Sequence, residues 1–168
     1  MKGALVSAII EAMKLRFIVD VNVGRLARRL RMLGYDTLFI NGADDDELIR
    51  IALEEKRILL TRDTGMMQRR VVTIGKAQAV FVESDHVRAQ LRQVVQALGL
   101  GPEFDSFSLC IECNEPLIPR VKEEVQTLIP PYVFSTQEQF MQCPECERIY
   151  WRGTHWDRMM AEIEDLEN

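Results

Sequence analysis

The fold is decided by the stretch Arg57-Ile58-Leu59-Leu60-Thr61-Arg62-Asp63. Its apolar residues give way to a polar Thr-Arg-Asp step, and Thr64-Gly65 then breaks the run. A short apolar run bounded by turn residues predicts a buried strand of the kind found in parallel sheets. Ligands of open α/β sheets bind just beyond the carboxyl ends of such strands, which is where Asp63 is expected to lie.

A second segment, Arg16-Phe17-Ile18-Val19-Asp20, is built in the same way and also ends in Asp. Between the two segments, Asp44-Asp45-Asp46-Glu47 begins a predicted helix. A parallel sheet brings the ends of its strands to one edge, so we expect three acidic groups at a common rim. Carboxylates held close together repel one another unless cations join them. The pattern therefore predicts a divalent-metal site.

Apolar runs and helical patterns alternate over the first hundred residues. Strands are expected at residues 16–20, 35–40, 57–62 and 79–82, and helices at 22–33, from 44 onward and from 84 to 98. Asn22 is expected to cap the first of these helices and Ser84-Asp85 the last. The alternation predicts an α/β fold with a mostly parallel sheet flanked by helices.

A domain boundary is expected at Gly101-Pro102. Residues 1–101 would then form the α/β domain, led by an amphipathic helix at 1–14. Residues 102–168 would form a second domain that contains all the cysteines. Prolines interrupt its middle part, residues 148–151 are expected to form a strand, and a final acidic helix is expected from Thr154.

The net charge of −5 is distributed unevenly. Residues 1–100 contain 16 Lys and Arg against 12 Asp and Glu, whereas residues 101–168 contain 5 against 14. The predicted metal site thus lies in the basic half, which is compatible with a nucleic-acid partner. With 47% hydrophobic residues the chain is expected to be globular. No apolar run approaches the length of a membrane span, so no membrane partner is expected. The short apolar run near the N-terminus is followed by Glu11 and Lys14 and not by a signal-peptide cleavage site, so a cytoplasmic protein is expected.

The four cysteines occur as two pairs, Cys110-x-x-Cys113 and Cys143-x-x-Cys146. In a reducing compartment such pairs indicate thiolate metal ligands before disulfides. Two pairs suit tetrahedral Zn²⁺, and four protein ligands leave no open position, so the predicted zinc is structural. A redox dithiol is disfavoured because the second pair leads into the strand expected at 148–151 and not into a helix.

Several segments, in order along the chain, carry a family resemblance. They are Phe17-Ile18-Val19-Asp20, the run from Gly24 to Asp36, Asp45-Asp46-Glu47-Leu48-Ile49, the run from Arg57 to Asp63, Gln90-Leu91, Cys143-Pro144-Glu145-Cys146 and the run from Tyr150 to Trp156. In these segments the chain resembles the Mut-seven-C RNase domains, which are PIN-like nucleases with a zinc ribbon. The resemblance implies a PIN-type fold and metal-dependent cleavage of RNA. By position it implies Asp20, Asp45 and Asp63 as the acids of the site.

The residues themselves leave two interpretations of the acids open. The candidate catalytic ligands of Mg²⁺ or Mn²⁺ are Asp20, Asp63 and, from the third group, Asp45 or next Asp46. Such an ion would generate the attacking water and stabilise the leaving oxygen. The alternative is helix capping, since acids in a first turn suit the helix dipole. Asp85 is the residue available as a fourth acid, and for it capping is favoured.

Basic and aromatic residues near the two predicted sites are candidates for RNA contact. The candidate substrate-binding arginines are Arg25, Arg28, Arg29 and Arg62. They would hold flanking phosphates or, alternatively, form a solvated helix face. The aromatic group is Tyr150, Trp151, Arg152, His155 and Trp156. It would stack RNA bases or, as favoured here, pack the zinc ribbon onto the nuclease domain.

Taken together, the sequence predicts a Mg²⁺- or Mn²⁺-dependent ribonuclease with a structural zinc ribbon and RNA as its partner. The alternative is a catalytically silent RNA- or protein-binding adaptor in which the acids cap helices and the ribbon is the interface. A dinucleotide-binding domain is disfavoured because Gly24 stands alone, without a glycine-rich loop around it.

Overall fold

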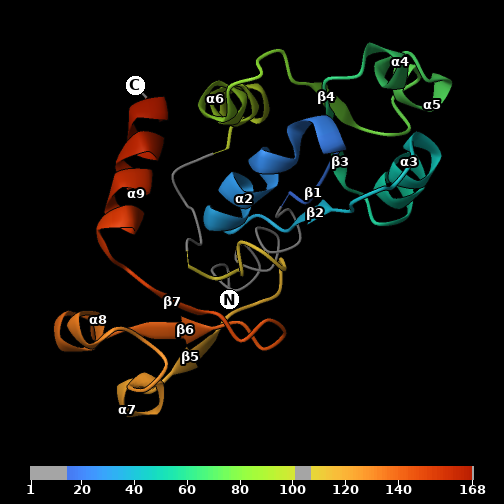
Figure 1. Cartoon of the computed structure of the whole chain (residues 1–168). Helices are drawn as coiled ribbons and strands as arrows, with labels where there is room; N and C mark the ends of the chain where they lie inside the picture. Colours follow the sequence, from blue (N-terminus) through green and yellow to red (C-terminus); the bar gives the residue numbers. More distant parts are fainter. Residues whose placement is uncertain (1–14, 101–106, 168) are drawn as a thin grey trace, which may run out of the picture.

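The computed structural model describes residues 15–100 and 107–167, which contain two separate sheets (Figure 1). The first sheet has four parallel strands in the order β2-β1-β3-β4. Their bounds are β1 Phe17–Val19, β2 Thr37–Phe39, β3 Ile58–Thr61 and β4 Ala79–Phe81. The two central strands are buried along their whole length, in agreement with their continuous apolar sequence.

Helices cover both faces of this sheet (Figure 1). They are α2 Gly24–Met32, α3 Asp45–Glu54, α4 Thr64–Met67, α5 Arg70–Thr73 and α6 Val87–Leu98. Phe17 and Val19 of β1 pack in one cluster with α2 and α6, whereas Ile18 packs in another with α3. This division follows from the alternation of side chains along a strand. The predicted α/β fold with a parallel sheet flanked by helices is confirmed.

The chain enters α2 differently from the prediction. A short 3-10 helix, η1 (Val21–Val23), follows Asp20 and is capped by the Asp20 carboxylate, which accepts a hydrogen bond from the Val21 N–H. The α2 helix begins at Gly24 and has no side-chain cap. The predicted Asn22 cap is therefore wrong, because the Asn22 amide is used in bonds to Asp20 and to the Arg62 N–H.

The predicted cap of α6 is also wrong. This helix begins at Val87, two residues later than Asp85, and its N-cap position is occupied by His86 without a side-chain cap. Ser84 Oγ accepts a hydrogen bond from the His86 N–H at 3.1 Å. The Asp85 carboxylate is left exposed, 3.7 Å from His86 Nε2.

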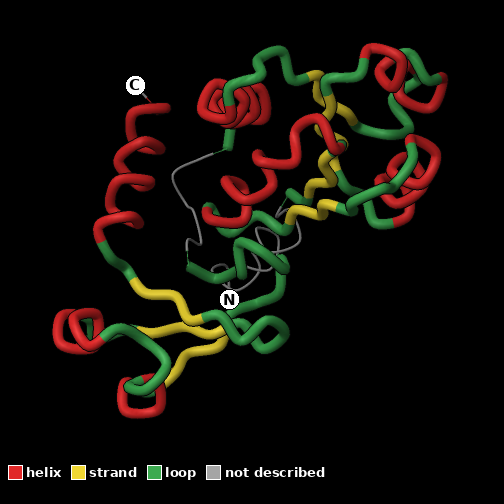
Figure 2. The backbone as a smooth tube through the Cα atoms, in the orientation of Figure 1, coloured by secondary structure: helices red, strands yellow, loops and turns green. Residues whose placement is uncertain are grey.

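The second sheet is antiparallel, with the strand order β5-β6-β7. Its elements are β5 Ile118–Arg120, α7 Lys122–Val125, α8 Pro131–Thr136, β6 Phe140–Gln142 and β7 Ile149–Trp151. Figure 2 shows its strands apart from those of the parallel sheet. The strand expected at 148–151 is thus confirmed as β7. The proline-interrupted segment before β6 contains only short elements.

The last helix, α9 (Thr154–Glu167), runs from β7 back beside the first domain (Figure 1). Met160 packs against the α2–α6 cluster, and Arg88 Nη2 of α6 lies 3.4 Å from Asp165 Oδ2. The predicted leading helix at 1–14 lies outside the described residues, as does the predicted domain boundary at 101 and 102. No helix within the described ranges is long and apolar enough to cross a membrane.

Candidate active site and metal centre

Asp20 lies at the carboxyl end of β1 and is only 6% exposed. Its Oδ1 accepts a hydrogen bond from the Val21 N–H at 2.6 Å. Its Oδ2 accepts one from Asn22 Nδ2 at 2.8 Å and one from the Thr61 hydroxyl at 2.7 Å. A buried carboxylate with three donors is held in one orientation, at the edge where the sequence predicts the site.

Asp63 lies beyond the end of the neighbouring strand β3 and is exposed. Its Oδ1 caps α4 by accepting hydrogen bonds from the N–H groups of Gly65 and Met66, at 2.6 and 3.2 Å. Its own N–H donates to Thr61 Oγ1 at 2.9 Å. The buried Thr61 hydroxyl therefore bridges the two strand-end acids. Asp63 Oδ2 accepts no hydrogen bond from the described part of the chain.

The third acidic group lies in the first turn of α3, after β2. Asp44 caps this helix by accepting a hydrogen bond from the Glu47 N–H at 2.9 Å. Asp46 forms an ion pair with Arg69. Asp45 is exposed, and within the described ranges it has neither a hydrogen bond nor an ion pair through its side chain.

The structure brings the acids to the same side of the sheet but not into one ligand cluster. Asp20, Asp45 and Asp63 do not form a described group whose ligand atoms lie within 4.8 Å of one another. Mg²⁺ keeps several waters and is commonly held by only one or two carboxylates. Asp20 is buried and fixed and Asp63 has an open oxygen, whereas a closed cage of three carboxylates is not present among the described residues.

The four candidate arginines differ in their surroundings. Arg25 is exposed and lines a pocket beside the start of α2, whereas Arg62 is half-buried next to Asp63. Arg28 forms an ion pair with Glu112, and Arg29 also has an interaction partner. The hydrogen bond from Arg28 lowers the pKa of Glu112. Arg25 is thus the arginine of this group that is most available to a phosphate.

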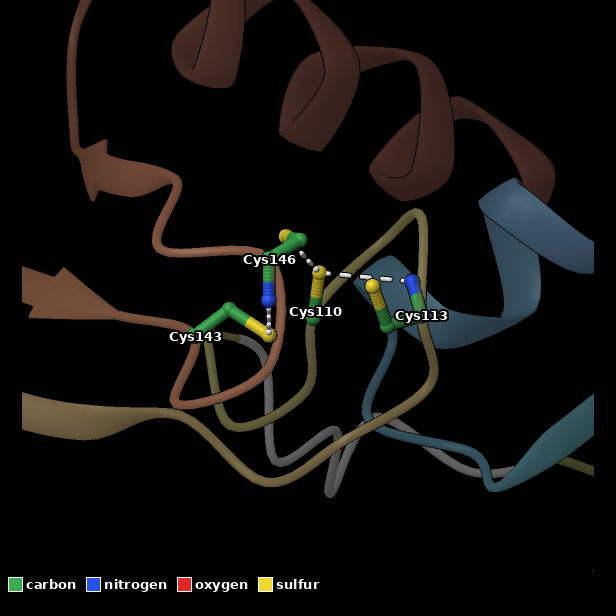
Figure 3. A group of neighbouring side chains, drawn as sticks. All are labelled: Cys110, Cys113, Cys143 and Cys146. Carbon is green, nitrogen blue, oxygen red and sulfur yellow. Dashed lines mark hydrogen bonds between the residues drawn. The ribbon is translucent and has the colours of Figure 1, made fainter.

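The four cysteine side chains gather at one point, as Figure 3 shows. All four are free thiols, and a ligand sulfur of each lies within 4.8 Å of the others. The Sγ atoms of Cys110 and Cys146 are 3.7 Å apart. Two thiolates bound to tetrahedral Zn²⁺ at about 2.3 Å lie roughly 3.8 Å apart, so the spacing fits this ion. The described chain contains no other group of three or more His, Cys, Asp or Glu side chains placed to hold a metal.

The two cysteine knuckles have the same local structure. The Cys113 N–H donates to Cys110 Sγ at 3.3 Å, and the Cys146 N–H donates to Cys143 Sγ at 3.5 Å. Tyr150 Oη lies 3.0 Å from Cys110 Sγ. Burial alone would raise the pKa of Cys110, but the hydrogen bonds from Tyr150 and from backbone N–H groups outweigh it and lower the pKa to about 7. The thiolate that zinc requires is therefore favoured at Cys110.

The first knuckle is fastened to the parallel sheet by two residues that the sequence analysis missed. Arg31 is buried, and its Nη1 donates to the carbonyl oxygens of Ile111 and Glu112 at 3.0 and 2.8 Å. Asn114 Oδ1 accepts a hydrogen bond from the Thr37 N–H at 2.8 Å. Helical periodicity places Arg31 only at the edge of a basic face, and nothing in the sequence indicates its buried partners.

The described residues of the aromatic group contact other side chains of the C-terminal part of the chain. Trp151 packs on the ribbon cluster that contains Phe140. Trp156 contacts Phe107 edge to face, with ring centroids 5.2 Å apart, and the Arg152 guanidinium lies over both rings. Tyr150 is engaged with Cys110, and the side chain of His155 is outside the described part. These contacts are all within the described segment 107–167, so packing of the ribbon onto the nuclease domain stays a prediction, as does RNA stacking.

A family model described as Mut7-C RNAse domain matches residues 15–163. The match therefore spans both sheets and includes the strand-end acids as well as all four cysteines. Comparison of the chain with curated proteins and with solved structures gave no match.

Proposed function

Because the chain belongs to the Mut7-C RNAse domain family, we propose that it is a ribonuclease that hydrolyses RNA phosphodiester bonds at the carboxyl edge of the parallel sheet. The observation that carries the proposal is the fixed pair of acids at this edge. Asp20 is buried with its carboxylate oriented by Thr61, and the same hydroxyl holds the backbone of Asp63 beside it. Such preorganisation is characteristic of a site that must bind charge in one place.

Asp20 and Asp63 are proposed as the main ligands of Mg²⁺ or Mn²⁺. Asp45, at the same edge of the sheet, is proposed as the third acidic residue of the site. When bound, the ion would neutralise phosphate charge and lower the pKa of a water. The open Oδ2 of Asp63 is proposed as the oxygen that contacts this ion, since Oδ1 accepts the cap hydrogen bonds. Arg25, exposed beside this edge, would hold a neighbouring phosphate of the strand.

The cysteine centre is proposed to hold structural zinc. Its four sulfurs complete a tetrahedral set and leave no position for a substrate. Its knuckle is fastened to α2 and β2 through Arg31 and Asn114. Zinc would therefore stabilise the ribbon and its attachment to the nuclease domain, and it would take no part in the cleavage step.

The test is a cleavage assay of the full chain on labelled single-stranded and duplex RNA, with Mg²⁺, with Mn²⁺ and without added divalent ions. Cleavage is expected only with the ion. Asp20→Asn and Asp63→Asn are each expected to reduce the rate at least a hundredfold, because each removes a charge from the cation site. Asp157→Asn, the same change at an exposed position of α9, is the matched control and is expected to retain the rate.

Zinc content is measured in every sample, so that loss of the structural ion is not mistaken for loss of the catalytic one. Cleavage that persists in Asp20→Asn, or without a divalent ion, would contradict the proposal. The ends of the products would also distinguish endonucleolytic from exonucleolytic cleavage.

A second candidate function is that of a non-catalytic RNA- or protein-binding adaptor. One observation favours it: Asp20, Asp44 and Asp63 each cap a helix, and Asp46 is paired with Arg69. An adaptor would bind RNA or protein without cleaving RNA under any metal condition. In that case Asp63→Asn would lower the free energy of unfolding, because the negative charge at the N-terminus of α4 is lost, and would leave the binding of RNA or protein intact.

A further inference from the structure

A pocket of about 560 Å³ lies between the first turns of α2 and α6, beside the edge that holds Asp20. Its polar and aromatic lining includes Asn22, Arg25, Phe39, Asp85, Gln90 and Glu112. Its volume is within the range of about 300–1,000 Å³ typical of small-molecule sites. Asn22 connects it with the candidate active site, since the same amide that lines the pocket donates to Asp20 Oδ2.

The amide of Gln90 offers this pocket a hydrogen-bond acceptor in a fixed orientation. The Gln90 side chain is 3% exposed, and its Nε2 donates to the Ser84 carbonyl at 2.9 Å, which fixes the orientation of the amide. Its Oε1 accepts no hydrogen bond from any described residue. Gln93 of the same helix, by contrast, uses both ends of its amide, at the Phe81 carbonyl and the Glu83 N–H. Gln90 Oε1 is not among the described, fully enclosed side-chain atoms that lack a partner, so it is accessible from the pocket that Gln90 lines, where a donor from a ligand can reach it.

The remaining lining residues define the chemistry of that ligand. Arg25 is exposed and forms no ion pair within the described ranges, so it is available to a phosphate. Asp85 adds a carboxylate acceptor to the amide acceptor of Gln90, whereas the Glu112 carboxylate is ion-paired with Arg28 and Arg148. Phe39 contributes an apolar wall, and it lies so close to Gly24 that a Cβ there would come within 2.9 Å of the Phe39 ring. The pocket thus combines one available cation, an aromatic wall and the acceptors of Gln90 and Asp85.

We propose that this pocket binds one nucleotide of the RNA beside the cleaved phosphate and selects its base. Gln90 Oε1 accepts an N–H from the Watson–Crick edge of the base, and Arg25 contacts the adjoining phosphate. An exocyclic amino group has two N–H donors, which Gln90 Oε1 and the Asp85 carboxylate can both accept, so bases with such a group are bound in preference to uracil, which offers a single N–H. The inference rests on the proposed function, since it takes the RNA strand as the ligand.

The experiment measures binding without cleavage, in full-length Asp20→Asn protein. Fluorescence anisotropy compares labelled oligoadenylate and oligocytidylate with oligouridylate of the same length. The two amino-bearing oligomers are expected to bind roughly three- to tenfold more tightly, the worth of one hydrogen bond. Adding Gln90→Met should abolish this preference, whereas Gln96→Met, the same change at an exposed position of α6, should preserve it.

A second measurement does not depend on the folding of a Gln90 variant. In the wild-type chain labelled with ¹⁵N, adenosine monophosphate is expected to shift the Gln90 side-chain amide and the backbone amides of Asn22 and Arg25 more than uridine monophosphate does. Equal binding of all oligomers, or shifts confined to other residues, would overturn the pocket proposal even if RNA is cleaved. Selective binding by a chain that never cleaves RNA would support the pocket and overturn the proposed function instead.

Discussion

At the scale of single residues, the Thr61 hydroxyl occupies the position between the two strand-end acids. It donates to Asp20 Oδ2 at 2.7 Å and accepts from the Asp63 N–H at 2.9 Å. Thr61 itself is fully buried, so water cannot replace these bonds without a rearrangement of the edge. One hydroxyl thus couples the stability of the sheet edge to the orientation of both acids.

We expect Thr61→Val to lower the free energy of unfolding by about 1–3 kcal/mol, because it leaves a buried carboxylate and a backbone N–H without their partner. The change keeps the β-branched shape and therefore tests the hydroxyl alone. Urea denaturation measures the effect, with Thr73→Val as the control. The Thr73 hydroxyl is exposed and donates to the Arg70 carbonyl within its own short helix, so its loss should cost within about 0.5 kcal/mol. Equal stability of the two variants would count against the bridging role.

Asp36 is a second residue with a measurable electrostatic role. It accepts hydrogen bonds from Arg57 Nη1 and Asn114 Nδ2, each at 2.7 Å. Burial alone would raise the pKa of Asp36, but the bonds from Arg57 and Asn114 outweigh burial and lower it. The charged form of Asp36 therefore stabilises the folded state.

This lowered pKa predicts a pH dependence of stability. The contribution of Asp36 is fully present above its unfolded pKa of about 3.9, and it is lost as the pH falls through the lower folded pKa. The free energy of unfolding should therefore fall less steeply below about pH 4 in Asp36→Asn than in the wild type. Asp157→Asn, at an exposed position, should show the wild-type slope. The slopes are compared between variants because acid also releases zinc from the cysteines.

At the scale of elements, the two cysteine knuckles are copies of one turn. The residue after each pair has a positive φ, 69° at Asn114 and 59° at Glu147. Its N–H donates to the carbonyl of the first cysteine, at 2.9 Å for Asn114 and 3.0 Å for Glu147. Asn adopts the left-handed conformation more readily than Glu does, so the backbone of the second knuckle is the more strained of the two.

This comparison predicts opposite effects of two exchanges. Glu147→Asn should raise the free energy of unfolding by about 1 kcal/mol, because it relieves the left-handed strain at an exposed position. Asn114→Glu should lower it by more than that amount, since it also removes the bonds to Thr37 and Asp36. Chemical denaturation of the zinc-loaded protein measures both. A loss of stability in Glu147→Asn would show that the Glu147 side chain has a role of its own.

The elements differ in how far the sequence could predict them. The strand ending at Thr61 was predictable because a run of apolar residues with turn signals has few other uses. The cysteine spacing likewise predicted the metal centre. The Asn22 cap was mispredicted because the Asn22 amide bonds Asp20 and the Arg62 N–H, and the Asp85 cap because α6 begins only at Val87. Arg31 and Gln90 were beyond prediction, since a buried polar side chain in an amphipathic helix is recognised only by what it meets in space.

At the scale of the whole molecule, polar contacts join the two sheets. The described apolar clusters of the parallel sheet and of the ribbon are separate. The link consists of Arg31 on the knuckle carbonyls, Asn114 on the edge of β2, and the ion pair of Arg28 with Glu112. These partners all lie between Cys110 and Asn114, so one cysteine turn carries the link between the sheets, while Met160 and Asp165 of α9 make further contacts with the parallel-sheet part.

Removal of zinc should therefore undock the ribbon and leave the parallel sheet folded. The ribbon has a small apolar core and would lose the ion that joins its two knuckles, whereas β1 and β3 are buried between two helix layers. Native-state hydrogen exchange on chelator-treated protein measures this at single amides. The Thr37 N–H, which donates to Asn114, should exchange much faster, and the Phe17 N–H, which donates to the Asp36 carbonyl in the sheet domain, should remain protected. Equal loss of protection at both amides would mean that the two sheets unfold as one unit, and unchanged protection at Thr37 would mean that docking does not depend on the metal.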